Sequence, residues 1–90
     1  MAKVEIYTKG YCPFCTRAIS LLEHKATAFP ALKVEEISIN SNMALREKMI
    51  ARSNGSYTVP QIFIDDVHIG GCDQLVALEM NHKLDVLLVE

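Results

Sequence analysis

The strongest constraint on the fold is a pair of cysteines at the point where the hydrophobic pattern changes from strand to helix. Residues 3–8 place the apolar residues Val4 and Ile6 in alternation, which is the period-two pattern of a strand. Helical spacing follows from Pro13, with apolar side chains at Cys15, Ala18, Ile19 and Leu22. Proline suits the first helical position, because a helix leaves that N–H unpaired. We therefore predict a helix from Pro13 to about His24 or Lys25.

The rest of the chain predicts a strand, a helix, a hairpin and a last helix. Residues 32–39 form an edge strand in which Glu35-Glu36 breaks the alternation and leaves room for a bulge. Residues 43–53 carry good helix formers, and Asn54-Gly55 ends that helix. Two short apolar runs at 61–64 and 67–69 flank a two-residue turn and predict an antiparallel hairpin. A last helix runs from about Cys72 to Met80, and residues 84–89 either extend it or dock as a tail.

This order of elements predicts an α/β fold. A parallel strand pair joined by a right-handed helical crossover, together with a hairpin, gives a four-stranded mixed sheet with helices on both faces. The chain has 90 residues and shows no repeat or linker, so we expect a single domain spanning residues 1–90.

Composition narrows the function. Half of the residues are apolar and 22% are charged, which excludes a disordered chain. A net charge of -2 argues against nucleic acid or a membrane surface as the main partner. No apolar run approaches the ~18 residues of a membrane span, and the first residues lack the pattern of a secretory leader. We therefore expect a cytoplasmic protein.

The spacing of Cys12 and Cys15 favours redox chemistry. The chain has three cysteines, an odd number that argues against a disulfide scaffold. Cys12 precedes the helix, so the unpaired N–H groups and the positive end of the helix dipole should face its sulfur. Such positions lower a thiol pKa from ~8.5 to roughly 3.5–7.5, and Lys9 and Arg17 add positive charge nearby. We predict that Cys12 attacks and that Cys15, on the buried stripe, resolves through a disulfide between the two.

Two other interpretations of the cysteines remain open. They are either small buried hydrophobic residues, or half of a zinc site that Cys12 and Cys15 complete with His68 and Cys72. Against zinc, Pro13-Phe14 is unlike the small polar turn that wraps a metal, and a long segment separates Cys15 from His68. His68 also alternates with Val67 and Ile69, which predicts a solvated side chain.

Three motifs together resemble a known family. Tyr11-Cys12-Pro13-Phe14-Cys15, Thr58-Val59-Pro60 and Gly70-Gly71-Cys72-Asp73 are similar to the small dithiol glutaredoxins of bacterial type, over nearly the whole chain. The resemblance implies a thioredoxin-like fold and a glutathione-dependent thiol–disulfide oxidoreductase. Cys12 would be the nucleophile and Cys15 the resolving thiol. Glutathione would be the co-substrate, disulfide-bearing or glutathionylated proteins the other partners, and the protein a monomer without a metal.

The resemblance also implies residues that bind glutathione. Pro60 matches the family's cis-proline, and Val59 would pair with glutathione through its backbone. Lys9 would lie near a glutathione carboxylate and Asp73 near the amine or carboxylate, with backbone N–H groups of Gly71 and Cys72 beside it. Further groove residues would be Tyr11, Phe14 and Thr58. The chain departs from the family in having Phe14 where tyrosine is more common; Cys72 is a third cysteine.

Two alternative functions remain open within this superfamily. Two chains could bridge an iron–sulfur cluster through Cys12 and glutathione, although cluster-binding members usually lack a proline directly after the first cysteine. A thioredoxin-type reductant is the other alternative. It is disfavoured by the absence of a Trp-Cys-Gly-Pro-Cys motif and by the presence of Gly70 to Asp73.

Overall fold

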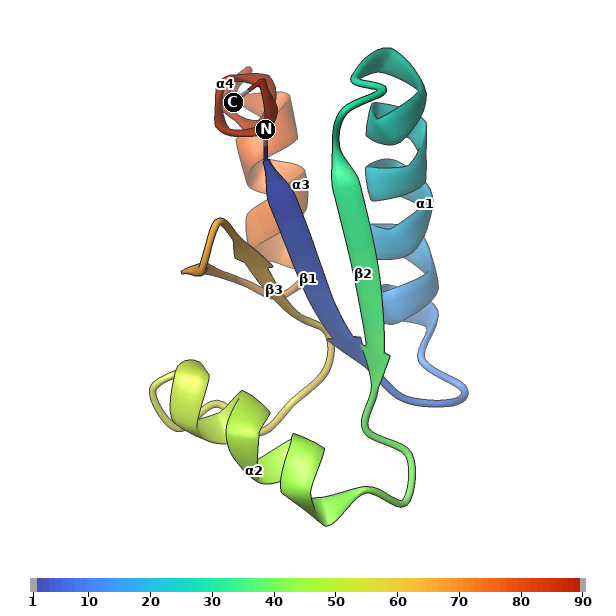
Figure 1. Ribbon diagram of the computed structural model, residues 1–90, viewed down its shortest axis with the longest axis vertical. Coiled ribbons are helices and arrows are strands. Elements are labelled where there is room, and N and C mark those ends of the chain that lie inside the picture. Colours follow the sequence, from blue (N-terminus) through green and yellow to red (C-terminus); the bar gives the residue numbers. More distant parts are fainter. Residues whose placement is uncertain (1, 90) are drawn as a thin grey trace.

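A four-stranded mixed sheet forms the centre of the molecule, as the computed structural model of residues 2–89 shows (Figure 1). The strand order is β2-β1-β3-β4, so β2 and β4 form the edges. The central strand β1 is parallel to β2 and antiparallel to β3, and β3 is antiparallel to β4. The bounds of the strands are β1 (Lys3–Thr8), β2 (Lys33–Ser38), β3 (Gln61–Ile64) and β4 (Val67–Gly70). The predicted α/β fold with a mixed sheet is confirmed.

Helices cover both faces of the sheet (Figure 1). The helix α1 (Pro13–Ala28) and the helix α3 (Cys72–Met80) pack together on one face. The helix α2 (Met43–Arg52) packs on the other face, where Met49 is fully buried. The predicted arrangement with helices on both faces is therefore confirmed.

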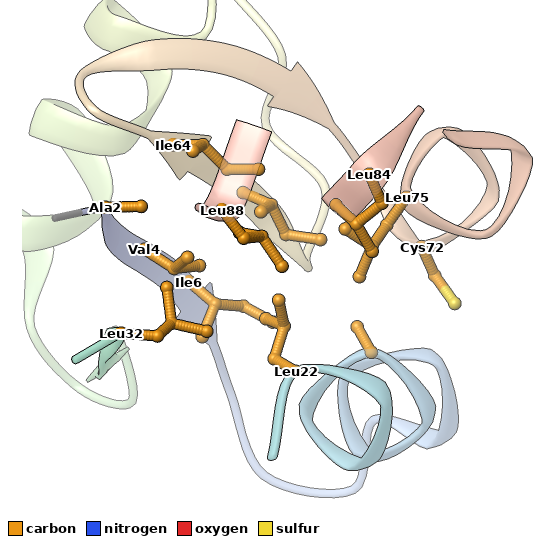
Figure 2. Packing of buried hydrophobic residues seen from close by; sticks show 12 residues of the cluster. Ala2, Val4, Ile6, Leu22, Leu32, Ile64, Cys72, Leu75, Leu84 and Leu88 are labelled. Atoms are coloured by element: carbon orange, nitrogen blue, oxygen red, sulfur yellow. The ribbon is translucent and has the colours of Figure 1, made fainter. Parts of the chain in front are cut away.

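Alternation along β1 divides the buried side chains into two clusters. Val4 and Ile6 point into the main core, where Figure 2 shows them facing Leu22 of α1 and Leu75 of α3. Tyr7 lies on the opposite face of the sheet in the second cluster, whose other members are Ile39, Met49 and Phe63. Because successive residues of a strand point to opposite faces, one short strand supplies both clusters.

The first helix is longer than predicted. It continues past Lys25 to Ala28, because the buried ammonium group of Lys25 has partners outside the helix. Lys25 Nζ lies 2.8 Å from Glu79 Oε1 and 2.6 Å from Asp85 Oδ1. A lysine at that position can therefore stay on the inner face of the helix.

The bulge predicted at Glu35-Glu36 is absent. β2 pairs with β1 residue for residue, from Lys3 with Lys33 to Thr8 with Ser38, so Glu35-Glu36 is regular edge strand. The irregular pairing lies in the hairpin, between Ile62 and Phe63. The hairpin turn itself is as predicted: Asp65 and Asp66 have φ of 50° and 68°, the left-handed conformations of a tight two-residue turn.

The C-terminal segment docks as a separate short helix, α4 (Leu84–Leu88), rather than extending α3. Leu84 and Leu88 are buried in the main core, where Figure 2 shows Leu84 beside Leu75. In residues 2–89, no helix has both the length and the apolar character that a membrane span requires.

Candidate active site

Cys12 is the N-cap of α1, and its sulfur accepts a hydrogen bond from the helix. The backbone N–H of Cys15 donates to Cys12 Sγ at 3.1 Å. Cys12 and Cys15 form a disulfide, with their Cα atoms 5.1 Å apart. Cys12 is half-buried, whereas Cys15 is 3% exposed. The predicted asymmetry, with one accessible sulfur facing helix N–H groups and one buried sulfur, agrees with this geometry.

Two aromatic side chains flank the disulfide and stay in solvent. Tyr11 directly precedes Cys12, has φ of 54° and is fully exposed. Phe14 lies in the first turn of α1 with 57% of its surface exposed. A positive φ is uncommon for a bulky residue, so the backbone before Cys12 turns sharply and directs the Tyr11 ring away from the core.

The segment Thr58–Pro60 brings a second motif to the disulfide. The Val59–Pro60 peptide bond is cis, as expected, and Pro60 is buried. The carbonyl oxygen of Val59 lies 3.8 Å from Cys12 Sγ. Gly71 adjoins the same segment so closely that a Cβ at this position would lie 3.3 Å from the Pro60 carbonyl oxygen. All three motifs of the sequence therefore meet around Cys12.

Two grooves open on either side of Val59. The proline-side groove has a volume of about 510 Å³. Its walls include Phe14, Thr58, Val59, Pro60, Gly71, Cys72 and Asp73. The lysine-side groove, also of about 510 Å³, includes Lys9, Tyr11, Cys12, Arg46, Tyr57, Thr58 and Val59. Every residue expected to bind glutathione lines one of the two, and Thr58 and Val59 line both.

The charges of the two grooves are opposite in sign. Lys9 and Arg46 place positive charge in the lysine-side groove, and Asp73 places negative charge in the proline-side groove. Sequence reasoning expected N–H groups of Gly71 and Cys72 to be available here. The N–H of Gly71 is instead occupied, since it donates to Gln74 Oε1 at 2.8 Å. The helix start at Cys72 and Asp73 supplies the remaining N–H groups.

Cys72 is a free cysteine that the fold buries. Its side chain is 4% exposed at the start of α3 and packs in the main core. Burial raises the pKa of the Cys72 thiol above its usual value, opposed by the positive charge of Arg17. This thiol is therefore a poorer nucleophile at neutral pH than an unperturbed one.

The zinc alternative has no assembled site in the part of the chain that the structure describes. No three side chains of the metal-binding types gather there. The prediction of a solvated His68 is wrong: its Nε2 lies 2.7 Å from Gln61 Oε1, and its ring packs on Phe63. Sequence reasoning missed the buried Gln61. The signal for Gln61 was a polar residue at the start of an apolar strand.

A family model described as glutaredoxin matches residues 4–69. The chain belongs to the glutaredoxin family. Glutaredoxin 3 of Escherichia coli strain K12 is 56% identical over 88 residues, which cover 98% of this chain and 99% of that protein. The resemblance given by the three sequence motifs is therefore confirmed.

Solved glutaredoxin structures share the fold. The solution structure of glutaredoxin from Brucella melitensis has a TM-score of 0.78 and 46% sequence identity, covering 98% of this chain and 89% of that one. The crystal structure of a buckwheat glutaredoxin–glutathione complex has a TM-score of 0.79 and 26% identity, covering 94% and 74%. The thioredoxin-like fold expected of the family is present here.

As a glutaredoxin, the chain is a thiol–disulfide oxidoreductase. The Cys12–Cys15 disulfide is the oxidised form of its Cys-Pro-Phe-Cys dithiol. Glutaredoxins use glutathione as the reductant. The function implied by the resemblance is thus confirmed at the level of the reaction class.

Proposed function

We propose that this glutaredoxin holds the glutathione part of its substrate across both grooves, with Cys12 as the nucleophile. Glutathione carries carboxylates and an ammonium group, and the two grooves offer Lys9 at one end and Asp73 at the other. Val59 lies between them, beside Cys12 Sγ. The glutathione complex of the buckwheat relative supports this assignment. Tyr11, Phe14 and Thr58 complete the walls.

The reaction begins at the sulfur of Cys12. Its thiolate attacks the glutathione sulfur of a mixed disulfide, the new Cys12–glutathione disulfide forms, and the substrate thiolate leaves and takes a proton from water. A second glutathione thiolate then attacks the glutathione sulfur of that intermediate. Oxidised glutathione leaves and Cys12 returns as a thiolate. Each turnover therefore consumes one free glutathione, whose sulfur is oxidised to the disulfide level while the substrate sulfur is reduced to a thiol.

Cys15 serves the reduction of protein disulfides. After Cys12 has attacked such a substrate, the Cys15 thiol loses its proton and attacks Cys12 Sγ, which releases the second substrate thiolate. The Cys12–Cys15 disulfide remains, and glutathione reduces it. The close approach of the two cysteines supports this role, with 5.1 Å between their Cα atoms.

The observation that carries the proposal is the hydrogen bond from the Cys15 N–H to Cys12 Sγ at 3.1 Å. The N–H donor at a helix N-terminus favours an anionic sulfur, which is both the attacking group and the leaving group of this chemistry. We further propose that the protein acts as a monomer in the cytoplasm, on glutathionylated or disulfide-bearing proteins rather than on nucleic acid or membranes. The net charge of -2 supports the last point.

Turnover of two substrates tests the roles of the two cysteines. With a glutathionylated peptide, Cys12→Ser should lose all activity and Cys15→Ser should keep it. With a protein disulfide, both variants should lose activity. Cys12→Ser forms no mixed disulfide with the substrate, and Cys15→Ser forms one that is not resolved. Normal turnover of the glutathionylated peptide by Cys12→Ser would contradict the proposal.

A further inference from the structure

A buried amide connects the hairpin to the segment that faces Cys12. Gln61, the first residue of β3, is only 4% exposed. Its Nε2 donates to the carbonyl oxygen of Thr58 at 3.0 Å and lies 3.4 Å from Thr58 Oγ1. Its Oε1 lies 2.7 Å from His68 Nε2. The side chain therefore links β4 to the Thr58–Pro60 segment through hydrogen bonds at both of its polar atoms.

The direction of this chain of hydrogen bonds is fixed by chemistry. The Thr58 carbonyl can only accept, so the amide nitrogen of Gln61 must face it and the amide oxygen must face His68. His68 therefore carries a proton on Nε2. Both the neutral tautomer with a proton on Nε2 and the imidazolium donate from this atom. The hydrogen bonds thus run from His68 to Gln61 to Thr58 in either protonation state.

The far end of the chain of hydrogen bonds is held by packing. The His68 ring lies against Phe63, with 5.1 Å between the ring centroids and 33° between the planes. Phe63 is 1% exposed and belongs to the second cluster, where the Arg52 guanidinium carbon lies 4.0 Å from its ring centroid. His68 is therefore fixed by a buried residue on the neighbouring strand.

The near end of the chain of hydrogen bonds reaches the reacting sulfur through the backbone. Thr58 precedes Val59, whose carbonyl oxygen lies 3.8 Å from Cys12 Sγ, and both residues line both grooves. We infer that Gln61 and His68 are positioning residues that hold Thr58 and Val59 in the geometry that binds the glutathione part of the substrate. This inference rests on the proposed binding of glutathione in these grooves.

Loss of either side chain should weaken substrate binding more than the chemical step. Gln61→Leu removes both hydrogen bonds, and His68→Phe removes the donor while keeping a ring against Phe63. For a glutathionylated peptide, each variant should raise KM about tenfold, the effect of one lost buried hydrogen bond, with kcat within about twofold of wild type. His68→Gln, which keeps an N–H donor, should restore part of the loss. The double variant should be no worse than Gln61→Leu, since the residues act in series.

Val67→Thr is the matched control, because Val67 is exposed on the same edge strand and lines neither groove. Its KM should equal that of wild type. Backbone ¹H–¹⁵N spectra should show the Thr58 and Val59 signals displaced in Gln61→Leu and His68→Phe and unchanged in Val67→Thr. These spectra also show that each variant is folded.

Unchanged KM in both folded variants would overturn the inference, and so would a loss of thermal stability alone. A wild-type protein without glutathione-dependent turnover would contradict the proposed function instead. In that event the spectra decide whether Gln61 and His68 hold the segment: unmoved Thr58 and Val59 signals refute it, and displaced signals support it.

Discussion

Arg52, the last residue of α2, donates to both carboxylate oxygens of Glu5 on the central strand, at 3.2 and 2.9 Å. The guanidinium also donates to the hydroxyl of Tyr7 at 3.0 Å and lies over the Phe63 ring. Glu5 is 9% exposed, so this is a largely buried ion pair. It fixes the end of α2 to the sheet immediately before the loop that leads to Val59.

The pair of Arg52 and Glu5 should make the free energy of unfolding depend on pH in the acidic range. The hydrogen bonds from Arg52 hold the pKa of Glu5 below its ordinary value of 4.5. A lowered pKa in the folded state gives stability that is present above the unfolded pKa and is lost as the pH falls through the folded pKa. We expect the free energy of unfolding to decrease between pH 5 and the folded pKa.

Glu5→Gln should therefore reduce the free energy of unfolding at pH 7 by about 2 kcal/mol and make its fall in acid shallower. Urea unfolding at several pH values measures both effects. Glu23→Gln, at an exposed position on α1, is the control and should change neither. An acid dependence of the same steepness in Glu5→Gln and wild type would refute this account of the pair.

Lys25 should make the free energy of unfolding depend on pH in the alkaline range. Its ammonium group lies between Glu79 and Asp85, whose hydrogen bonds raise the pKa of Lys25 above 10.5. A raised pKa gives stability that is complete below the unfolded pKa and is lost as the pH rises through the folded pKa. Lys25→Met should lower the free energy of unfolding at pH 7 by about 1–2 kcal/mol and remove part of the alkaline loss. Lys33→Met, at an exposed position, serves as the control. Urea unfolding at several alkaline pH values measures the effect. The same dependence of the free energy of unfolding on pH in Lys25→Met and wild type would contradict this role of Lys25.

Charge neutralisation in the grooves should act on substrate binding. Lys9→Met and Asp73→Asn each remove one of the charges that we assign to opposite ends of glutathione. Each should raise KM for a glutathionylated peptide about fivefold, the value of one solvent-accessible charged contact. High salt should raise the KM of wild type by a larger factor than the KM of either variant. Lys33→Met should behave as wild type in this assay; if Lys9→Met does too, the assignment of Lys9 is wrong.

Local sequence patterns sufficed for the type and order of the elements and for the placement of Cys12 at the start of a helix. The strand and helix that flank Cys12 follow from the alternation of Val4 and Ile6 and from the spacing of apolar residues after Pro13. These patterns report on hydrophobic burial along one element, which is a local property. The prediction therefore gave the fold class and the groove residues, the latter with the help of the family resemblance.

Two of the errors concern polar residues whose partners are distant in sequence. Lys25 continues α1 because Glu79 and Asp85 neutralise it. His68 is half-buried because Gln61 Oε1 accepts a hydrogen bond from its Nε2–H. A buried charge or amide depends on one specific partner, and periodicity does not identify that partner. Such residues look like solvated surface until the fold is known.

The central claim is that Cys12 is the sulfur that takes glutathione, and its direct test is the site of the adduct. The Cys15→Ser variant retains two thiols, Cys12 beside the helix N–H groups and Cys72, which is buried and has a raised pKa. After reaction with oxidised glutathione at pH 7, intact mass and peptide mapping should find one glutathione, attached to Cys12. An adduct on Cys72, or none at Cys12, would contradict the account.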